Sequence, residues 1–255
     1  MRWSNRFQFA LAATALLGGA LLMARAVPRA QLSANLTMQA APAPLPSPSP
    51  EAPKRVLPEF FVMIDPSHGG DDKGAMLAGG KVAEKEISLT LARELKRQLE
   101  ERGIAVRLLR DSDVNLSLER RATATNEERP GIYIALHAGQ PGKGVRVYSS
   151  ALALAQPPAA GRFLPWEAAQ AGSLEHSRAV ARIVANEMRK TGLPVATLSV
   201  PLRPLNNLIT PAIAVEWAPG PEDLRPPQAQ RLGNMLASAI ASGIVQARSQ
   251  GAERP

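Results

Sequence analysis

The sequence predicts an α/β protein with three layers, in which helices lie on both sides of a mostly parallel sheet. Short apolar segments with strand character alternate with longer segments of helical periodicity, and this alternation is typical of parallel sheets. The chain has 255 residues, of which 45% are hydrophobic, so it can fill a core of this kind. We expect one such domain over residues 59–250.

Five short apolar segments are predicted as β-strands. They cover residues 60–65, 104–109, 132–136, 144–148 and 212–215. Polar residues stand at the ends of three of them. Asp65 ends the first, His137 follows the third and Glu216 follows the last. In open parallel sheets the ligand lies outside the carboxyl ends of the strands, so these ends are where a site is expected.

Four segments carry apolar residues at the three- and four-residue spacing of a helix. They cover residues 84–102, 116–127, 173–190 and a final segment around 232–244. In the first, Leu91 and Leu95 belong to one apolar face, and Gly103 stands where the C-cap of the helix is expected. Residues 67–80 and 151–170 show no such period and are expected to be loops.

The first 58 residues differ in composition from the rest of the chain. Arg2 and Arg6 precede an apolar run, and residues 1–30 are therefore expected to be a signal peptide or a retained membrane anchor. Residues 31–58 are rich in Pro and Ala and are expected to be a linker. We expect the chain to be exported to the periplasm or cell envelope, with membrane contact only through the first segment.

Charge and composition exclude several classes of function. The net charge is +8, but residues 1–58 contribute +5 of it and leave +3 for residues 59–255. With aromatic residues at only 4%, this argues against nucleic acid as a partner. The chain has no cysteine, which excludes thiolate metal sites and a cysteine nucleophile.

If the strands that precede them are parallel neighbours, four residues are expected at one edge of the predicted sheet. His68, His137 and Glu216 follow or end strands, and Glu84 opens the first helix. Two imidazoles and one carboxylate are a recurrent ligand set for catalytic zinc. Each residue also has a simpler structural explanation, such as a turn cap or a favourable charge at a helix start. Glu216 is the hardest to explain in that way, because its carboxylate ends a strongly apolar strand.

Five motifs spread over residues 60–247 resemble those of the zinc-dependent N-acetylmuramoyl-L-alanine amidases, often called type 3 amidases. In chain order they are IDPSHGGDDKGA (64–75), the pair Glu84-Lys85, LLRDSD (108–113), IYIALHA (132–138) and PAIAVEW (211–217). None of these motifs is specific alone, whereas five in the order of the family are a specific signal.

The resemblance implies a function and a site. It implies that His68, Glu84 and His137 bind Zn²⁺ and that Glu216 is the catalytic carboxylate. The implied reaction is hydrolysis of the amide between the lactyl group of N-acetylmuramic acid and L-alanine, with peptidoglycan as the partner. Two alternatives stay open, a peptidoglycan-binding or regulatory module on the same fold and a zinc peptidase that cuts the stem peptide. The sequence identifies no activator protein.

The sequence departs from the family pattern beside the implied site. Ser67 stands where the first motif usually has glycine, which would strain the backbone if this position needs a positive φ. Gly139 replaces an asparagine that often follows the histidine motif. Asp65 has two open roles, as a hydrogen-bond partner of a ligand imidazole or as a loop cap. Asp72 is expected to be a solvated loop or capping residue.

Overall fold

The computed structural model describes residues 60–139, 143–152 and 165–252. Its elements in chain order are β1 (Phe61–Pro66), β2 (Met76–Leu77), β3 (Val82–Ala83), α1 (Glu84–Glu100), β4 (Ala105–Leu108), α2 (Leu118–Glu128), β5 (Ile132–Ala138), β6 (Gly144–Ser150), η1 (Trp166–Ser173), α3 (Leu174–Arg189), β7 (Val195–Val200), η2 (Leu205–Asn207), β8 (Ala212–Ala218) and α4 (Gln228–Ala252). The elements η1 and η2 are 3₁₀-helices.

Two expected segments, the apolar segment 1–30 and the linker 31–58, lie outside the described residues. Most of the expected loop 151–170 lies outside them as well, and its described end belongs to η1. Among the helices of the described residues, none combines the length and apolar character needed to cross a membrane.

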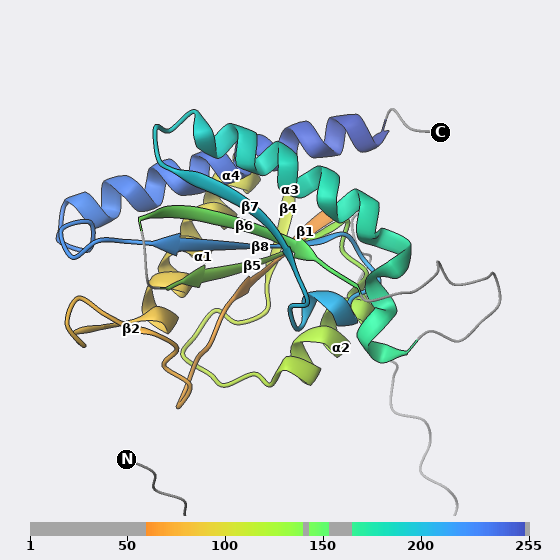
Figure 1. Ribbon diagram of the computed structural model, residues 1–255, viewed down its shortest axis with the longest axis horizontal. Helices are drawn as coiled ribbons and strands as arrows, with labels where there is room; N and C mark the ends of the chain where they lie inside the picture. Colours follow the sequence, from red (N-terminus) through yellow and green to blue (C-terminus); the bar gives the residue numbers. More distant parts are fainter. Residues whose placement is uncertain (1–59, 140–142, 153–164, 253–255) are drawn as a thin grey trace, which may run out of the picture. The chain divides into compact units, whose positions relative to one another are not determined.

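Six strands form one sheet in the order β4–β1–β5–β8–β6–β7 (Figure 1). The first four are parallel to one another, whereas β6 is antiparallel to β8 and parallel to β7. This confirms the prediction of a mostly parallel sheet. Because β1, β5 and β8 are parallel neighbours, the residues that follow them share one edge of the sheet.

The strands that the sequence does not predict are those with little apolar character or length. β7 is an edge strand whose residues are mostly exposed, so it lacks the apolar run of a buried strand. β2 and β3 have two residues each and pair with each other rather than with the main sheet. Such a short pair leaves no periodicity in the sequence.

Helices cover both faces of the sheet, as predicted. α1, α3 and α4 pack on one face against strand residues such as Ile64, Ile134 and Val215, and α3 and α4 lie side by side (Figure 1). On the other face, Met63 and Tyr133 belong to a smaller cluster with Ala122 of α2 and the residues around η2. Neighbouring residues of a strand point to opposite faces, which is why Met63 and Ile64 belong to different clusters.

The helix α1 begins at Glu84, one of the four candidate site residues. It runs from Glu84 to Glu100, and its predicted core residues Leu91 and Leu95 are buried. Gly103 has a φ of +73° just beyond its end, as expected for a glycine that closes a helix. Because Glu84 is the first residue of α1, its carboxylate lies at the positive end of the helix dipole. The preceding residue, Ala83, provides no side-chain cap.

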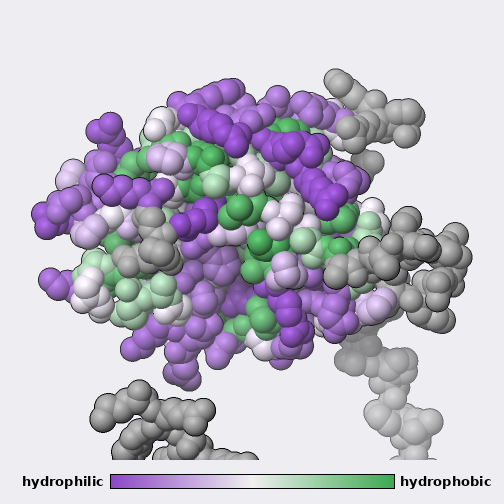
Figure 2. All heavy atoms as spheres, viewed as in Figure 1, coloured by the Kyte–Doolittle hydropathy of each residue, from purple (hydrophilic) through white to green (hydrophobic). Residues whose placement is uncertain are grey.

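The surface of the described residues carries no single apolar face in the view of Figure 2, where hydrophobic and hydrophilic side chains are interspersed. The exposed large hydrophobic residues come from separate elements and loops, namely Met76, Val114, Leu118, Trp166, Leu198 and Ile209. Single hydrophobic side chains of this kind are normal on a protein surface.

Candidate metal centre

The loop that carries His68 follows β1 and has an unusual backbone. His68 has a φ of +63°, a region that residues with a side chain rarely occupy. The buried Arg110 donates to the carbonyl oxygens of Pro66 at 2.8 Å and Ser67 at 3.0 Å. The buried Arg121 donates to the carbonyl oxygen of His68 at 2.8 Å. These bonds hold the strained backbone and thereby fix the point from which the His68 side chain extends.

Glu84 and His137 reach the same place from α1 and β5. Glu84 Oε1 lies 2.9 Å from His137 Nδ1, and Glu84 Oε2 lies 3.2 Å from His68 Nε2. The two imidazole rings are nearly perpendicular, at 83°, with their centroids 5.5 Å apart. One possible ligand atom from each of the three residues lies within 4.8 Å of the other two. The structure therefore brings three of the four residues together around one point.

Each imidazole has a second partner on the nitrogen that faces away from Glu84. His68 Nδ1 lies 2.9 Å from Asp72 Oδ2, and His137 Nε2 lies 2.8 Å from Ser67 Oγ. Metal-binding histidines almost always use their other nitrogen in this way, because the bond fixes the tautomer and the ring orientation. Both rings thus have the outer partner that a metal ligand needs.

The protonation of the centre follows from the same contacts. Burial alone would raise the pKa of Glu84, but its bonds to His137, His68 and the backbone N–H of Ala75 hold that pKa well below its usual range. The bond to Glu84 raises the pKa of His68, against the effect of burial and with help from Asp72. Glu84 is therefore ionised at any pH near neutrality, as a metal ligand must be.

The backbone passes close to the carboxylate and leaves no room for another side chain. Gly74 has a φ of +64°, and a Cβ there would lie 2.6 Å from His68 Cδ2 and 2.7 Å from Glu84 Oε2. Backbone N–H groups of Ala75 and Ala138 donate to the two oxygens of Glu84 at 2.9 and 3.1 Å. Two oriented imidazoles and one ionised carboxylate form a donor set that fits Zn²⁺.

Glu216 lies beside this group rather than in it. It is the partner of His137 in the register of β5 and β8, and the partner of Arg146 in the register of β8 and β6. Its Oε2 accepts a hydrogen bond from Tyr148 Oη at 2.5 Å and lies 3.3 Å from Arg146 Nη1. A Cβ on Gly139 would lie 2.3 Å from Glu216 Oε1, so the carboxylate occupies the space that an asparagine would take.

Several contacts of the site differ from the expectations for single residues. Asp72 is more than a solvated loop residue, because it bonds the imidazole of His68. Asp65 does not contact that imidazole; its carboxylate accepts hydrogen bonds from Arg121 and from Tyr133 Oη, and it anchors α2 to the sheet. The strain expected for a positive φ falls on His68, since Ser67 is not among the residues with such a backbone.

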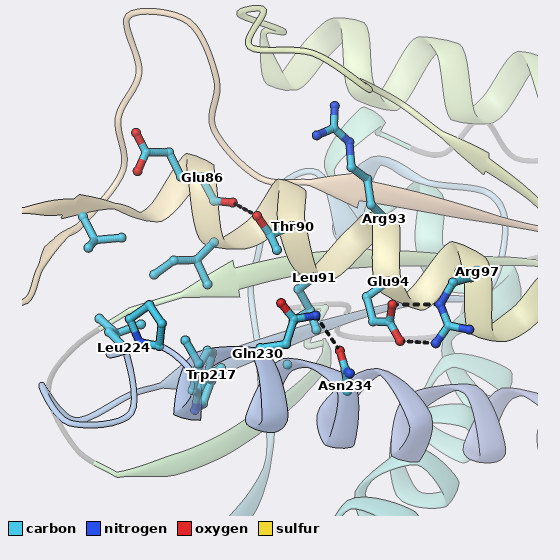
Figure 3. A pocket seen from close by; sticks show the side chains of 15 residues that line it. Glu86, Thr90, Leu91, Arg93, Glu94, Arg97, Trp217, Leu224, Gln230 and Asn234 are labelled. Atoms are coloured by element: carbon cyan, nitrogen blue, oxygen red, sulfur yellow. Dashed lines mark hydrogen bonds and ion pairs between the residues drawn. The ribbon is translucent and has the colours of Figure 1, made fainter.

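A separate groove of about 580 Å³ lies between α1 and α4. Figure 3 shows Leu91, Trp217 and Leu224 along it, together with polar side chains that include Gln230 and Asn234. None of the four candidate residues lines the groove, and its charged Glu94 is already paired with Arg97. The candidate chemistry therefore lies at the edge of the sheet and not in this groove.

A mostly parallel sheet with a His–Glu–His group at the carboxyl ends of its central strands defines a class of α/β protein with a candidate hydrolytic metal centre. Comparison with known proteins narrows this class. The sequence model of the N-acetylmuramoyl-L-alanine amidases matches residues 62–246, and the chain belongs to this family.

Curated relatives match over short segments. The N-acetylmuramoyl-L-alanine amidase AmiC of Neisseria meningitidis is 40% identical over 77 residues, which are 30% of this chain and 18% of that protein. An endolysin of Bacillus phage SPP1 is 38% identical over 90 residues, which are 34% of this chain and 32% of that protein. The match thus spans about a third or less of the length of these relatives.

Solved structures share the fold over most of the described chain. The catalytic domain of CwlV from Bacillus (Paenibacillus) polymyxa var. colistinus has a TM-score of 0.60 at 21% identity, over 74% of this chain and 98% of that one. AmiC2 of Nostoc punctiforme has a TM-score of 0.59 at 24% identity, over 74% of this chain and 97% of that one. Both are N-acetylmuramoyl-L-alanine amidases, and the likeness shows the α/β fold.

Proposed function

We propose that the chain is a zinc-dependent hydrolase that cleaves the amide bond between N-acetylmuramic acid and L-alanine in peptidoglycan. The observation that carries this proposal is the group of His68, Glu84 and His137, whose ligand atoms lie within 4.8 Å of one another in a member of the amidase family. These three residues are the proposed ligands of the ion.

Zinc, when bound, supplies the Lewis acidity that activates a water molecule and polarises the scissile carbonyl. Glu216 is the proposed general base, since it lies next to His137 in the sheet and keeps 19% of its side chain exposed. Its carboxylate accepts the proton of the attacking water and passes it to the departing alanine nitrogen. That second transfer is needed because an amide nitrogen leaves poorly as an anion.

Two residues of β6 orient the proposed base. Tyr148 donates to Glu216 Oε2, and Arg146 lies at 3.3 Å from the same oxygen. Burial, followed by the bond to Glu216, raises the pKa of Tyr148 to about 12, so the phenol stays protonated and continues to donate at neutral pH. The carboxylate is thereby held in one orientation before substrate arrives.

The proposal extends to the parts of the chain outside the described residues. Residues 1–30 would export the protein as a signal peptide or anchor, and residues 31–58 would separate the catalytic domain (59–250) from that segment. Peptidoglycan lies in the cell envelope, which makes export a requirement of the proposed activity. The CwlD amidase from Clostridioides difficile has been solved in complex with the GerS lipoprotein, which supports a protein partner as part of the same proposal.

The proposal is tested by digesting purified sacculi with the purified full-length chain and identifying the products by mass spectrometry. We expect free lactyl ends on the glycan strands and intact stem peptides that begin with L-alanine. A zinc chelator should abolish this release, and added zinc should restore it. Cut stem peptides would instead show a peptidase, and binding to sacculi without any cleavage would show a binding or regulatory module.

A further inference from the structure

We propose that Ser67 is a positioning residue of the metal centre, whose hydroxyl group holds the imidazole of His137 in the tautomer and orientation that direct Nδ1 to the metal. The inference rests on the metal site of the proposed function. It concerns a residue that stands where the resembled family motif usually has glycine, so the interaction is a property of this chain rather than of the motif.

The geometry around His137 carries the inference. Ser67 Oγ lies 2.8 Å from His137 Nε2, while Nδ1 of the same ring lies 2.9 Å from Glu84 Oε1. The ring is therefore held at both nitrogens, with Nδ1 turned toward the candidate ligand Glu84. On the other imidazole, Asp72 occupies the equivalent outer position.

Ser67 is itself firmly placed. Its backbone N–H donates to Leu136 O at 3.1 Å, and its carbonyl oxygen accepts hydrogen bonds from Ser88 Oγ at 2.8 Å and Arg110 Nη2 at 3.0 Å. The residue is only 5% exposed. Because the backbone is fixed on both sides, the position of the hydroxyl group depends on rotation about one side-chain bond alone, and that group can act as a fixed support for His137.

A hydroxyl group suits this position for a chemical reason. An imidazole that binds a metal through Nδ1 carries its proton on Nε2, and this N–H then donates to Ser67 Oγ. When Nδ1–H instead donates to Glu84, Nε2 accepts, and the same hydroxyl group donates to it. Serine serves both states because a hydroxyl is a donor and an acceptor, whereas a carboxylate only accepts.

The order Ser67–His137–Glu84 also has the connectivity of a Ser–His–acid catalytic triad. Two observations argue against a nucleophilic serine. Ser67 is buried, and the nearby backbone N–H groups of Gly69 and Gly70 already donate to Asp72 O and Asp113 Oδ1. They are thus not available to stabilise an oxyanion. The geometry favours a supporting role toward His137.

The test measures zinc affinity of the purified full-length chain by competition with a chromogenic chelator. Ser67→Ala should weaken zinc binding by about 10- to 100-fold, the usual effect of losing an outer partner of a ligand. Ser67→Thr keeps the hydroxyl group and should retain the affinity. Ser149→Ala is the matched control, since Ser149 is also buried but bonds Ser199 Oγ at 3.0 Å instead of a site residue.

Circular dichroism checks that each variant is folded, and the absorption spectrum of the Co²⁺-loaded chain gives a second readout, which should change in Ser67→Ala and not in Ser149→Ala. If Ser67→Thr does not fold, the contrast between the two alanine variants decides. Unchanged affinity in Ser67→Ala, or an equal loss in both alanine variants, would overturn the inference, as would labelling of Ser67 by a fluorophosphonate.

These measurements use the metal alone and no peptidoglycan, so they separate the two proposals. Absence of zinc binding in the unmodified chain would remove the proposed function and this inference with it. Zinc binding that is insensitive to Ser67→Ala would overturn this inference only. Zinc binding that weakens in Ser67→Ala would support it whatever bond the digest of sacculi shows to be cut.

Discussion

The two sides of the candidate site are held in different ways. On the ligand side, buried arginines bind the backbone of the loop that carries His68, and backbone N–H groups bind Glu84. On the other side, Glu216 is held by Tyr148 and Arg146, two side chains of a single neighbouring strand. The position of the proposed ligands is thus tied to the fold itself, whereas the orientation of Glu216 depends on local side chains.

This difference separates the expected effects of substitutions. Changes on the ligand side should alter metal content or stability, because they remove parts of the framework. Changes on the Glu216 side should alter the rate of hydrolysis and leave both the metal and the fold in place. Single substitutions on each side test this separation.

Glu216→Gln should lower the rate of hydrolysis of purified sacculi by about 10²- to 10⁴-fold, because the amide cannot accept the proton of the attacking water. Zinc content should stay that of the unmodified chain, since Glu216 is not one of the three grouped residues that are the proposed ligands. Dye release from labelled sacculi measures the rate, and elemental analysis measures the metal. Full activity in this variant would refute the role of Glu216.

Arg121→Met should lower the free energy of unfolding by about 3–5 kcal/mol, because it leaves the buried Asp65 carboxylate without its cationic partner. The measurement is urea unfolding followed by circular dichroism. The matched control is Arg120→Met, the preceding and exposed residue of the same helix, which should change stability by no more than about 0.5 kcal/mol. Equal effects of the two substitutions would show that the loop is not held as described.

Tyr148→Phe should give the smallest of these effects, about a tenfold loss of rate, since one hydrogen bond to a charged group is removed and the ring is kept. Steady-state kinetics on a soluble muropeptide should show the loss in kcat rather than in KM. Zinc content and unfolding free energy should not change. A variant with full kcat would show that Glu216 keeps its orientation without Tyr148.

The sequence predicts those strands and helices that bury apolar side chains in the core. Apolar runs and helical spacing identify the five strands other than the short β2 and β3 and the exposed edge strand β7, as well as the four helices. The sequence also places His68, His137 and Glu216 at one sheet edge on the condition that their strands are parallel neighbours, and β1, β5 and β8 meet that condition. Edge exposure and short length, rather than unusual chemistry, explain the missed elements.

The partners within the site are harder to predict. The bonds from Asp72 to His68 and from Ser67 to His137 depend on a loop in which His68 takes a positive φ. The hold of Tyr148 on Glu216 depends on the register of two antiparallel strands. Neither the loop backbone nor the register follows from periodicity, so the sequence identifies the candidate ligands better than the groups that orient them.

The most direct test of the account is the zinc content of the purified chain and of three single variants, His68→Ala, Glu84→Ala and His137→Ala. We expect one zinc ion per unmodified chain and none retained by any of the three variants after dialysis, with folding checked by circular dichroism. Stoichiometric zinc in all three folded variants would contradict the assignment of these residues as the metal centre.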